Sequence, residues 1–374
     1  MSQVSTTPAP TTEPSGAGEP PQKSSYTSTD RSVGSRLLSH NLFWPIMALV
    51  ALLVANTIYR PSFLAVTIRD GHLFGSPIDI LRNSSPLLLV ALGMTLVIAT
   101  RGIDLSVGAV VAISGALSLS YIQSSANPDS PFTVLVAVAV ALGVCLALGA
   151  WNGFMVAVLG IQPIIATLIL MMAGRGIAML ITGGFITTVN SGPYKWLASG
   201  WVLGLPVPFW IAAAMFTIVM LLCRKGALGM LIEAVGINPA AARLAGVRAR
   251  VITWTVYIVA GLFAGIAGLL LSANVMAADA NNAGLFIELD AILAVVIGGT
   301  SLAGGKFSLS GTAVGVFIIT TLTLTVTMLG ISPLITPLFK AVVVILVTLL
   351  QSPVAREKLE SMGRRRAAQG KAAE

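Results

Sequence analysis

The chain has 374 residues, of which 56% are hydrophobic and only 10% are charged, and its mean hydropathy is +0.91. A soluble domain carries about 25% charged residues, so this composition excludes an ordinary soluble protein. The net charge of +8 comes from basic residues that gather at the ends of apolar segments. There they set membrane orientation, and we expect no nucleic-acid partner.

The apolar segments predict an all-α, polytopic membrane protein with about ten transmembrane helices. Such a helix needs about 20 apolar residues. In chain order the expected spans are about 42–59, 86–100, 109–121, 132–151, 163–182, 206–223, 251–273, 291–302, 309–329 and 338–351. The second and eighth are short, which suggests broken helices. The expected outer loops at 123–131, 183–205 and 276–288 contain only Lys195 among Lys and Arg, so basic clusters place both termini inside the cell.

Three regions follow from this pattern. Residues 1–40 are rich in Ser, Thr, Pro and Gly without an apolar core, which predicts a disordered cytoplasmic tail rather than a signal peptide. Residues 41–352 form the transmembrane domain and include a basic cytoplasmic loop at 224–250. Residues 353–374 form a basic cytoplasmic tail.

The cytoplasmic loop contains the pattern of one short helix. Asn238 can cap its start through its side-chain oxygen, and Pro239 sits where a missing N–H costs nothing. Strong helix formers follow, and Gly246 supplies a left-handed stop. A capped helix at the membrane surface is suited to docking into a partner protein, although a simple turn between two spans is the alternative. Basic residues flank the loop on both sides: Arg224, Lys225, Arg248 and Arg250.

Polar residues near the hydrocarbon layer are costly and are therefore functional candidates. Carboxylates and amides also suit sugar hydroxyls, because together they accept and donate hydrogen bonds. The alternative is structural: Asp104 anchors a helix end, and Asp290 is a first-turn acid favoured by the helix dipole. The candidates for a translocation pathway are Asp104, Ser106, Asn152, Gln162, Asn281, Asn282 and Asp290.

The chain lacks the patterns of an enzyme. Gly305-Lys306 is followed by Phe307 rather than Ser or Thr, so no P-loop for ATP is formed there. The sequence shows no nucleophile–His pairing and no metal-ligand spacing, so we expect no cofactor and no metal. The spacings Gly261–Gly265 and Gly311–Gly315 predict close helix packing.

Three stretches carry a resemblance to a known family, which spans about residues 42–352. Residues 94–108 (MTLVIATRGIDLSVG), 290–302 (DAILAVVIGGTSL) and 235–247 (VGINPAAARLAGV) resemble the permease subunits of ribose-type carbohydrate ABC importers. Within that family, residues 73–81, 167–176 and 278–284 look most like the galactofuranose importer permease.

The resemblance implies a multi-pass subunit of the bacterial inner membrane that moves a monosaccharide of the galactofuranose, galactose or ribose class into the cytoplasm. It implies three partners: a separate ATPase subunit that binds ATP, a second permease chain (identical or paralogous) and a periplasmic sugar-binding protein. The loop residues expected to contact the ATPase are Glu233, Gly236, Asn238, Pro239, Ala242, Arg243 and Gly246.

Within this loop the resemblance and the local pattern suggest individual roles. Arg243 makes a charged contact, Gly236 and Gly246 set the bends, and Glu233 pairs with a basic neighbour. Two other functions stay open: a permease for another small solute, such as an amino acid or an autoinducer sugar, and a secondary transporter driven by an ion gradient. Few acids lie deep in a span, which disfavours the second.

Overall fold

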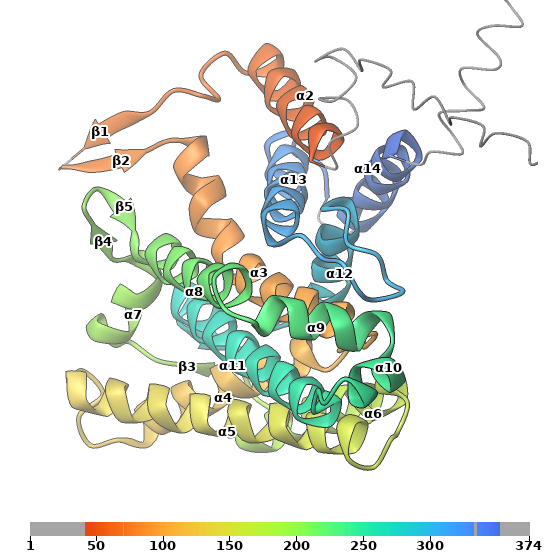
Figure 1. Cartoon of the computed structure of the whole chain (residues 1–374). Coiled ribbons are helices and arrows are strands. Elements are labelled where there is room, and N and C mark those ends of the chain that lie inside the picture. Colours follow the sequence, from red (N-terminus) through yellow and green to blue (C-terminus); the bar gives the residue numbers. More distant parts are fainter. Residues whose placement is uncertain (1–41, 70, 333–334, 352–374) are drawn as a thin grey trace, which may run out of the picture. The chain divides into compact units, whose positions relative to one another are not determined.

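The computed structural model describes residues 42–69, 71–332 and 335–351, and the predicted tails at 1–40 and 353–374 lie outside this part. Each predicted span overlaps one helix (Figure 1). These helices are α2 (Phe43–Tyr59), α3 (Ser76–Ala99), α4 (Val107–Ser124), α5 (Pro131–Ala157), α6 (Pro163–Ile181), α8 (Val207–Arg224), α11 (Ala249–Val275), α12 (Ile287–Ile297), α13 (Leu309–Met328) and α14 (Thr336–Gln351).

Seven helices in the described part are long and apolar enough to cross a membrane, namely α3, α4, α5, α6, α8, α11 and α13. The chain is therefore a helical, multi-pass membrane protein. Three further helices are shorter: α2 has 17 residues, α14 has 16 and α12 has 11. The shortness of α12 agrees with the prediction for span eight. Helix α3, in contrast, has 24 residues and starts ten positions before the predicted span, because its first turns carry polar residues that hide it from a hydropathy reading.

Glycine contacts bring the central helices close together. A Cβ on Gly261 of α11 would lie 2.6 Å from the carbonyl oxygen of Cys145 on α5, and one on Gly93 of α3 would lie 2.8 Å from the Cα of Ala260. A Cβ on Gly315 of α13 would lie 2.0 Å from the carbonyl oxygen of Ala294 on α12. Only hydrogen fits at these positions, so the close packing predicted from the glycine spacings is confirmed.

Short strands and one small helix join the helix ends on one side of the bundle. Antiparallel pairs form between β1 (Thr67–Arg69) and β2 (His72–Phe74), between β3 (Thr187–Thr188) and β6 (Ala277–Ala278), and between β4 (Trp201–Val202) and β5 (Leu205–Pro206). Helix α7 (Gly192–Ser199) lies among them. Trp201 stacks on His72 with ring centroids 5.0 Å apart, which holds the β1–β2 and β4–β5 hairpins together.

Candidate functional site

The loop at 224–250 folds into two helices, α9 (Leu228–Ile237), which was not predicted, and α10 (Pro239–Leu244), which was. The side-chain oxygen of Asn238 accepts hydrogen bonds from the backbone N–H groups of Ala240 (3.0 Å) and Ala241 (3.1 Å). Gly246 follows the helix with a φ of +84°. The predicted cap, the short helix and the left-handed stop are therefore confirmed.

One face of α10 is buried and the other is free. Ala242 is 6% exposed and packs with Val235 of α9 and Ala249 of α11, which fixes α10 to the bundle. On the opposite face Arg243 is exposed, and its Nε donates to the carbonyl of Pro239. Leu244 beside it is 92% exposed. A rigid helix thus presents one cation and one large apolar side chain. The exposure of Leu244 was not predicted, because in the sequence this residue indicates only a helix former.

Two expectations about the loop are corrected. Gly236 does not form a bend, because it lies inside α9, and the chain turns instead at Asn238 (φ −155°, ψ 98°). Gly236 is small because a Cβ there would lie 1.9 Å from the carbonyl oxygen of Ala99 at the end of α3. Among the described residues no ion pair joins Glu233 to a basic side chain. Glu233 and Arg224 instead line one cavity of about 290 Å³ between α8 and α9.

Three of the predicted pathway residues meet in a buried network. The Ser106 hydroxyl donates to Asp104 Oδ1 over 2.6 Å, and Asn152 Nδ2 donates to the Ser106 oxygen over 2.7 Å. Asp104 and Asn152 are only 2% and 1% exposed. The network ties the start of α4 to α5, which is the geometry that the anchoring alternative predicts. Gln162 lies apart from it, exposed at the residue before α6.

A cavity of about 450 Å³ with a mixed polar and apolar lining lies among α3, α12, α13 and α14. Lys340 of α14 forms an ion pair of 2.6 Å with Asp290, which lies in the first turn of α12. Of the predicted pathway residues, Asp290 and Asn282 line this cavity. The other five polar lining residues, including Lys340, were not predicted, although a single lysine within an apolar span is a usable signal. The polar lining is Asn83, Asn282, Asp290, Thr320, Thr323, Thr327 and Lys340.

A second cavity of about 420 Å³ adjoins the first and shares Asn282 with it. It lies between α4, α11 and the segment 276–286, whose fold depends on Asp279. The Asp279 carboxylate accepts from Asn282 Nδ2 (2.7 Å) and from the backbone N–H groups of Asn281 (3.0 Å) and Asn282 (3.2 Å). These hydrogen bonds, led by the one from the Asn282 side chain, lower the pKa of Asp279. The segment therefore contains an ionised carboxylate at neutral pH.

Arg175 of α6 forms hydrogen bonds with the backbone of the same segment. Its Nη1 donates to the carbonyl oxygens of Ala280 (3.1 Å) and Ala283 (2.6 Å). The guanidinium thus closes over two backbone groups next to Asn281 and Asn282. These two bonds hold to α6 a segment that lines the second cavity.

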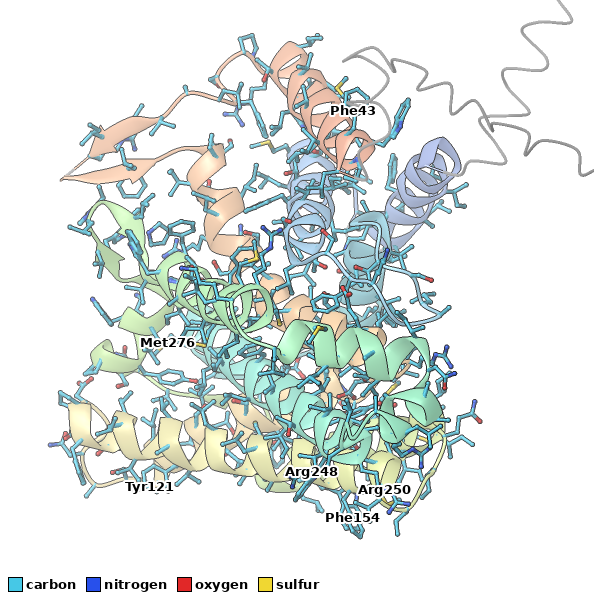
Figure 2. The ribbon with its side chains drawn as sticks, viewed as in Figure 1. Phe43, Tyr121, Phe154, Arg248, Arg250 and Met276 are labelled. Carbon is cyan, nitrogen blue, oxygen red and sulfur yellow. The ribbon has the colours of Figure 1, made fainter. Side chains whose placement is uncertain are left out.

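Helix α10 and the two cavities lie at opposite ends of the bundle. Helix α11 starts at Ala249, soon after α10, and ends at Val275 beside the second cavity. With 27 residues it is about 40 Å long. Figure 2 shows Arg248 and Arg250 near the α10 end of the bundle and Met276 towards the other end.

Comparison with known proteins identifies a family and several relatives of this chain. Residues 76–349 match the family described as branched-chain amino acid transport system / permease component. The chain is 50% identical to the galactofuranose transporter permease of Escherichia coli K12 over 83% of this chain and 90% of that protein. It is 46% identical to the fructose import permease of Bifidobacterium longum over 90% of this chain and 95% of the relative. The ribose import permease of Escherichia coli K12 is 38% identical, with 82% and 92% covered.

The family match covers well over half of the chain, and the relatives align along nearly their whole length. The resemblance predicted from the three sequence stretches is therefore confirmed. The chain belongs to the permease components of solute transport systems, within the group that contains the sugar importer permeases of the ribose type.

Proposed function

We propose that this chain is the membrane permease subunit of a bacterial ATP-driven importer that moves a monosaccharide into the cytoplasm. The observation that carries the proposal is the separation of two features along the bundle. A capped, rigidly held surface helix lies at one end, and two adjoining cavities that share Asn282 lie at the other. A channel or secondary transporter has no need of the first feature, whereas a subunit driven by a separate ATPase needs both.

Helix α10 is the proposed docking element for that ATPase. Arg243 supplies charge, and Leu244 supplies an apolar anchor of the kind that a groove on a partner buries. Asn238, Pro239 and Gly246 shape the helix and its exit. The permease itself binds no ATP and no other cofactor in this proposal, since ATP would be held by the partner.

The proposed membrane arrangement has ten passes or partial passes, with α2, α12 and α14 added to the seven long helices. Both termini and α10 then face the cytoplasm, in the bacterial inner membrane. The end with the strand pairs faces the periplasm, where a sugar-binding protein delivers the solute. A second permease chain, identical or paralogous, completes the translocation unit.

The cavity lining supports a neutral, hydroxyl-rich solute. Amide side chains such as Asn83 and Asn282 donate and accept at once, as sugar hydroxyls require. The two formal charges in the cavity, Asp290 and Lys340, already neutralise each other over 2.6 Å. An amino acid would need a free cation and a free anion instead. The names of the relatives agree with a sugar and suggest galactofuranose, fructose or ribose as first substrates to test.

The experiment is uptake of labelled sugars by cells that carry the complete importer and lack their own permease of this type. Depleting ATP should stop uptake, and a protonophore applied while ATP is maintained should not. Uptake that survives ATP depletion and collapses with the protonophore would favour an ion-gradient transporter. Uptake of a labelled amino acid in place of any sugar would reassign the substrate.

A further inference from the structure

Three segments meet at the inner end of α3. The carbonyl oxygen of Ala99, the last residue of α3, accepts a hydrogen bond of 2.9 Å from the N–H of Gly305. Gly305 belongs to the connection between α12 and α13 and has a φ of +93°. The last carbonyls of a helix have no partner within it. The end of α3 is therefore completed by the loop that leads into α13.

Helix α9 lies directly against this hydrogen bond. A Cβ on Gly236 would lie 1.9 Å from the Ala99 oxygen and 2.6 Å from the Gly305 nitrogen. No side chain separates the three backbones here, so α9 cannot shift towards the membrane without displacing α3 or the 298–308 connection. This contact between backbones is therefore stiffer than a contact between flexible side chains.

The side chain of Arg101 makes further contacts between the same segments. Its guanidinium donates to the carbonyl oxygen of Ile237, the last residue of α9, and a cation is favourable at a helix carboxyl end. Arg101 adopts a φ of +66°, a conformation that non-glycine residues rarely take. A Cβ on Gly304 would lie 2.4 Å from the Cγ of Arg101, so the arginine stem rests on that glycine. A residue that is held in a strained backbone conformation and whose side chain makes one specific contact is a candidate for function.

We propose that Arg101 is a positioning residue that couples the docking helix to the cavity walls. It binds the end of α9 to the ends of α3 and of the 298–308 connection. From Ala99, helix α3 then runs about 24 Å to Asn83 and about 29 Å to Ile80 at the cavity. Helix α13 starts after the same connection and lines the cavity with Thr320 and Thr323. A displacement of α10 by the ATPase thus reaches two walls of the cavity. This inference rests on the proposed function.

The test uses the complete importer purified with its ATPase and reconstituted in liposomes with the sugar-loaded binding protein. Three variants are compared with wild type. Arg101→Asn removes the guanidinium and places there a residue that tolerates the left-handed backbone. Arg101→Lys keeps a cation that can donate to Ile237. Lys306→Gln is the matched control, because it removes an exposed cation from the same connection. Two quantities are measured: the ATPase subunit retained by the tagged permease, and the ATP hydrolysed for each sugar transported.

Arg101→Asn should retain the ATPase subunit as wild type does, because α10 is untouched, and should raise the ATP used per sugar by about tenfold, a typical coupling between sites. Arg101→Lys should fall between it and wild type, and Lys306→Gln should match wild type. An unchanged ratio in Arg101→Asn, an equal rise in Lys306→Gln, or loss of the ATPase subunit from Arg101→Asn would overturn the proposal. A wild-type permease that retains no ATPase would instead contradict the proposed function itself.

Discussion

The ion pair between Asp290 and Lys340 gives the sharpest quantitative prediction for the cavity. The two side chains are 22% and 14% exposed and 2.6 Å apart. Removing one partner of a fully buried pair costs about 3–5 kcal/mol, because the other charge is left unpaired. Exposed pairs contribute about 0–1 kcal/mol. Since this pair is mostly but not fully buried, we expect each single variant, Asp290→Asn or Lys340→Met, to lose about 2 kcal/mol of unfolding free energy.

The double variant is the decisive member of the set. Asp290→Asn with Lys340→Met removes both charges and leaves no unpaired ion, so it should lose less stability than the sum of the single variants by about 1–2 kcal/mol. Unfolding of the purified permease in mixed micelles, followed by tryptophan fluorescence, measures this difference. Strictly additive losses would show that the two side chains do not interact in the protein.

The same variants also test the role of the pair in the cavity. Each single variant leaves a free charge among groups that suit a neutral sugar, and it should lower sugar uptake more than the double variant does. Uptake that falls equally in all three variants would indicate that the residues contribute hydrogen bonds rather than charge balance. The claim that the cavity requires the two charges to neutralise each other would then be refuted.

Three further predictions concern helix α10 and the segment 276–286. Asn238→Ala removes two accepted hydrogen bonds and should cost about 1 kcal/mol of helix stability; ATPase retention in a pull-down should drop, whereas Asn238→Asp should behave as wild type. Arg175→Gln removes the hydrogen bonds to the carbonyls of Ala280 and Ala283, so hydrogen exchange of segment 276–286 should quicken. Unchanged exchange would show that these two hydrogen bonds do not stabilise the segment. Asp279 has a lowered pKa, so its stabilisation of this segment is present above the unfolded carboxyl value of about 4 and is lost as the pH falls through the lower folded value. Exchange protection factors should thus stay constant from about pH 8 to about pH 5 and decrease below about pH 4, and a decrease already near pH 6 would contradict this assignment.

Much of the fold could be predicted because it depends on local patterns. Long apolar runs mark the helices, and Asn238 followed by Pro239 and closed by Gly246 marks α10. These signals lie within a few residues of one another. The start of α3 escaped prediction because Arg82 and Asn83 lower its hydropathy, although the residues fold as helix in contact with other segments.

The candidate site was harder to predict, because its contacts join residues far apart in the chain. The pairing of Asp290 with Lys340 spans 50 positions, and the bond from Arg101 to Ile237 spans 136. The role of Gly236 depends on Ala99 lying against it, which no local pattern shows. Residue type identified Asp290 and Asn282 as candidates, but only the arrangement of the helices shows that they line a shared cavity.

The central claim is that α10 binds an ATPase subunit. The most direct measurement is a pull-down of the tagged permease, expressed with the other importer subunits, in mild detergent. Arg243→Glu is compared with wild type and with Lys195→Glu, an equal charge reversal at an exposed site on α7. The account predicts that wild type and Lys195→Glu retain the ATPase subunit and that Arg243→Glu loses it. Retention by Arg243→Glu at the wild-type level, or no ATPase with any folded permease, would contradict it.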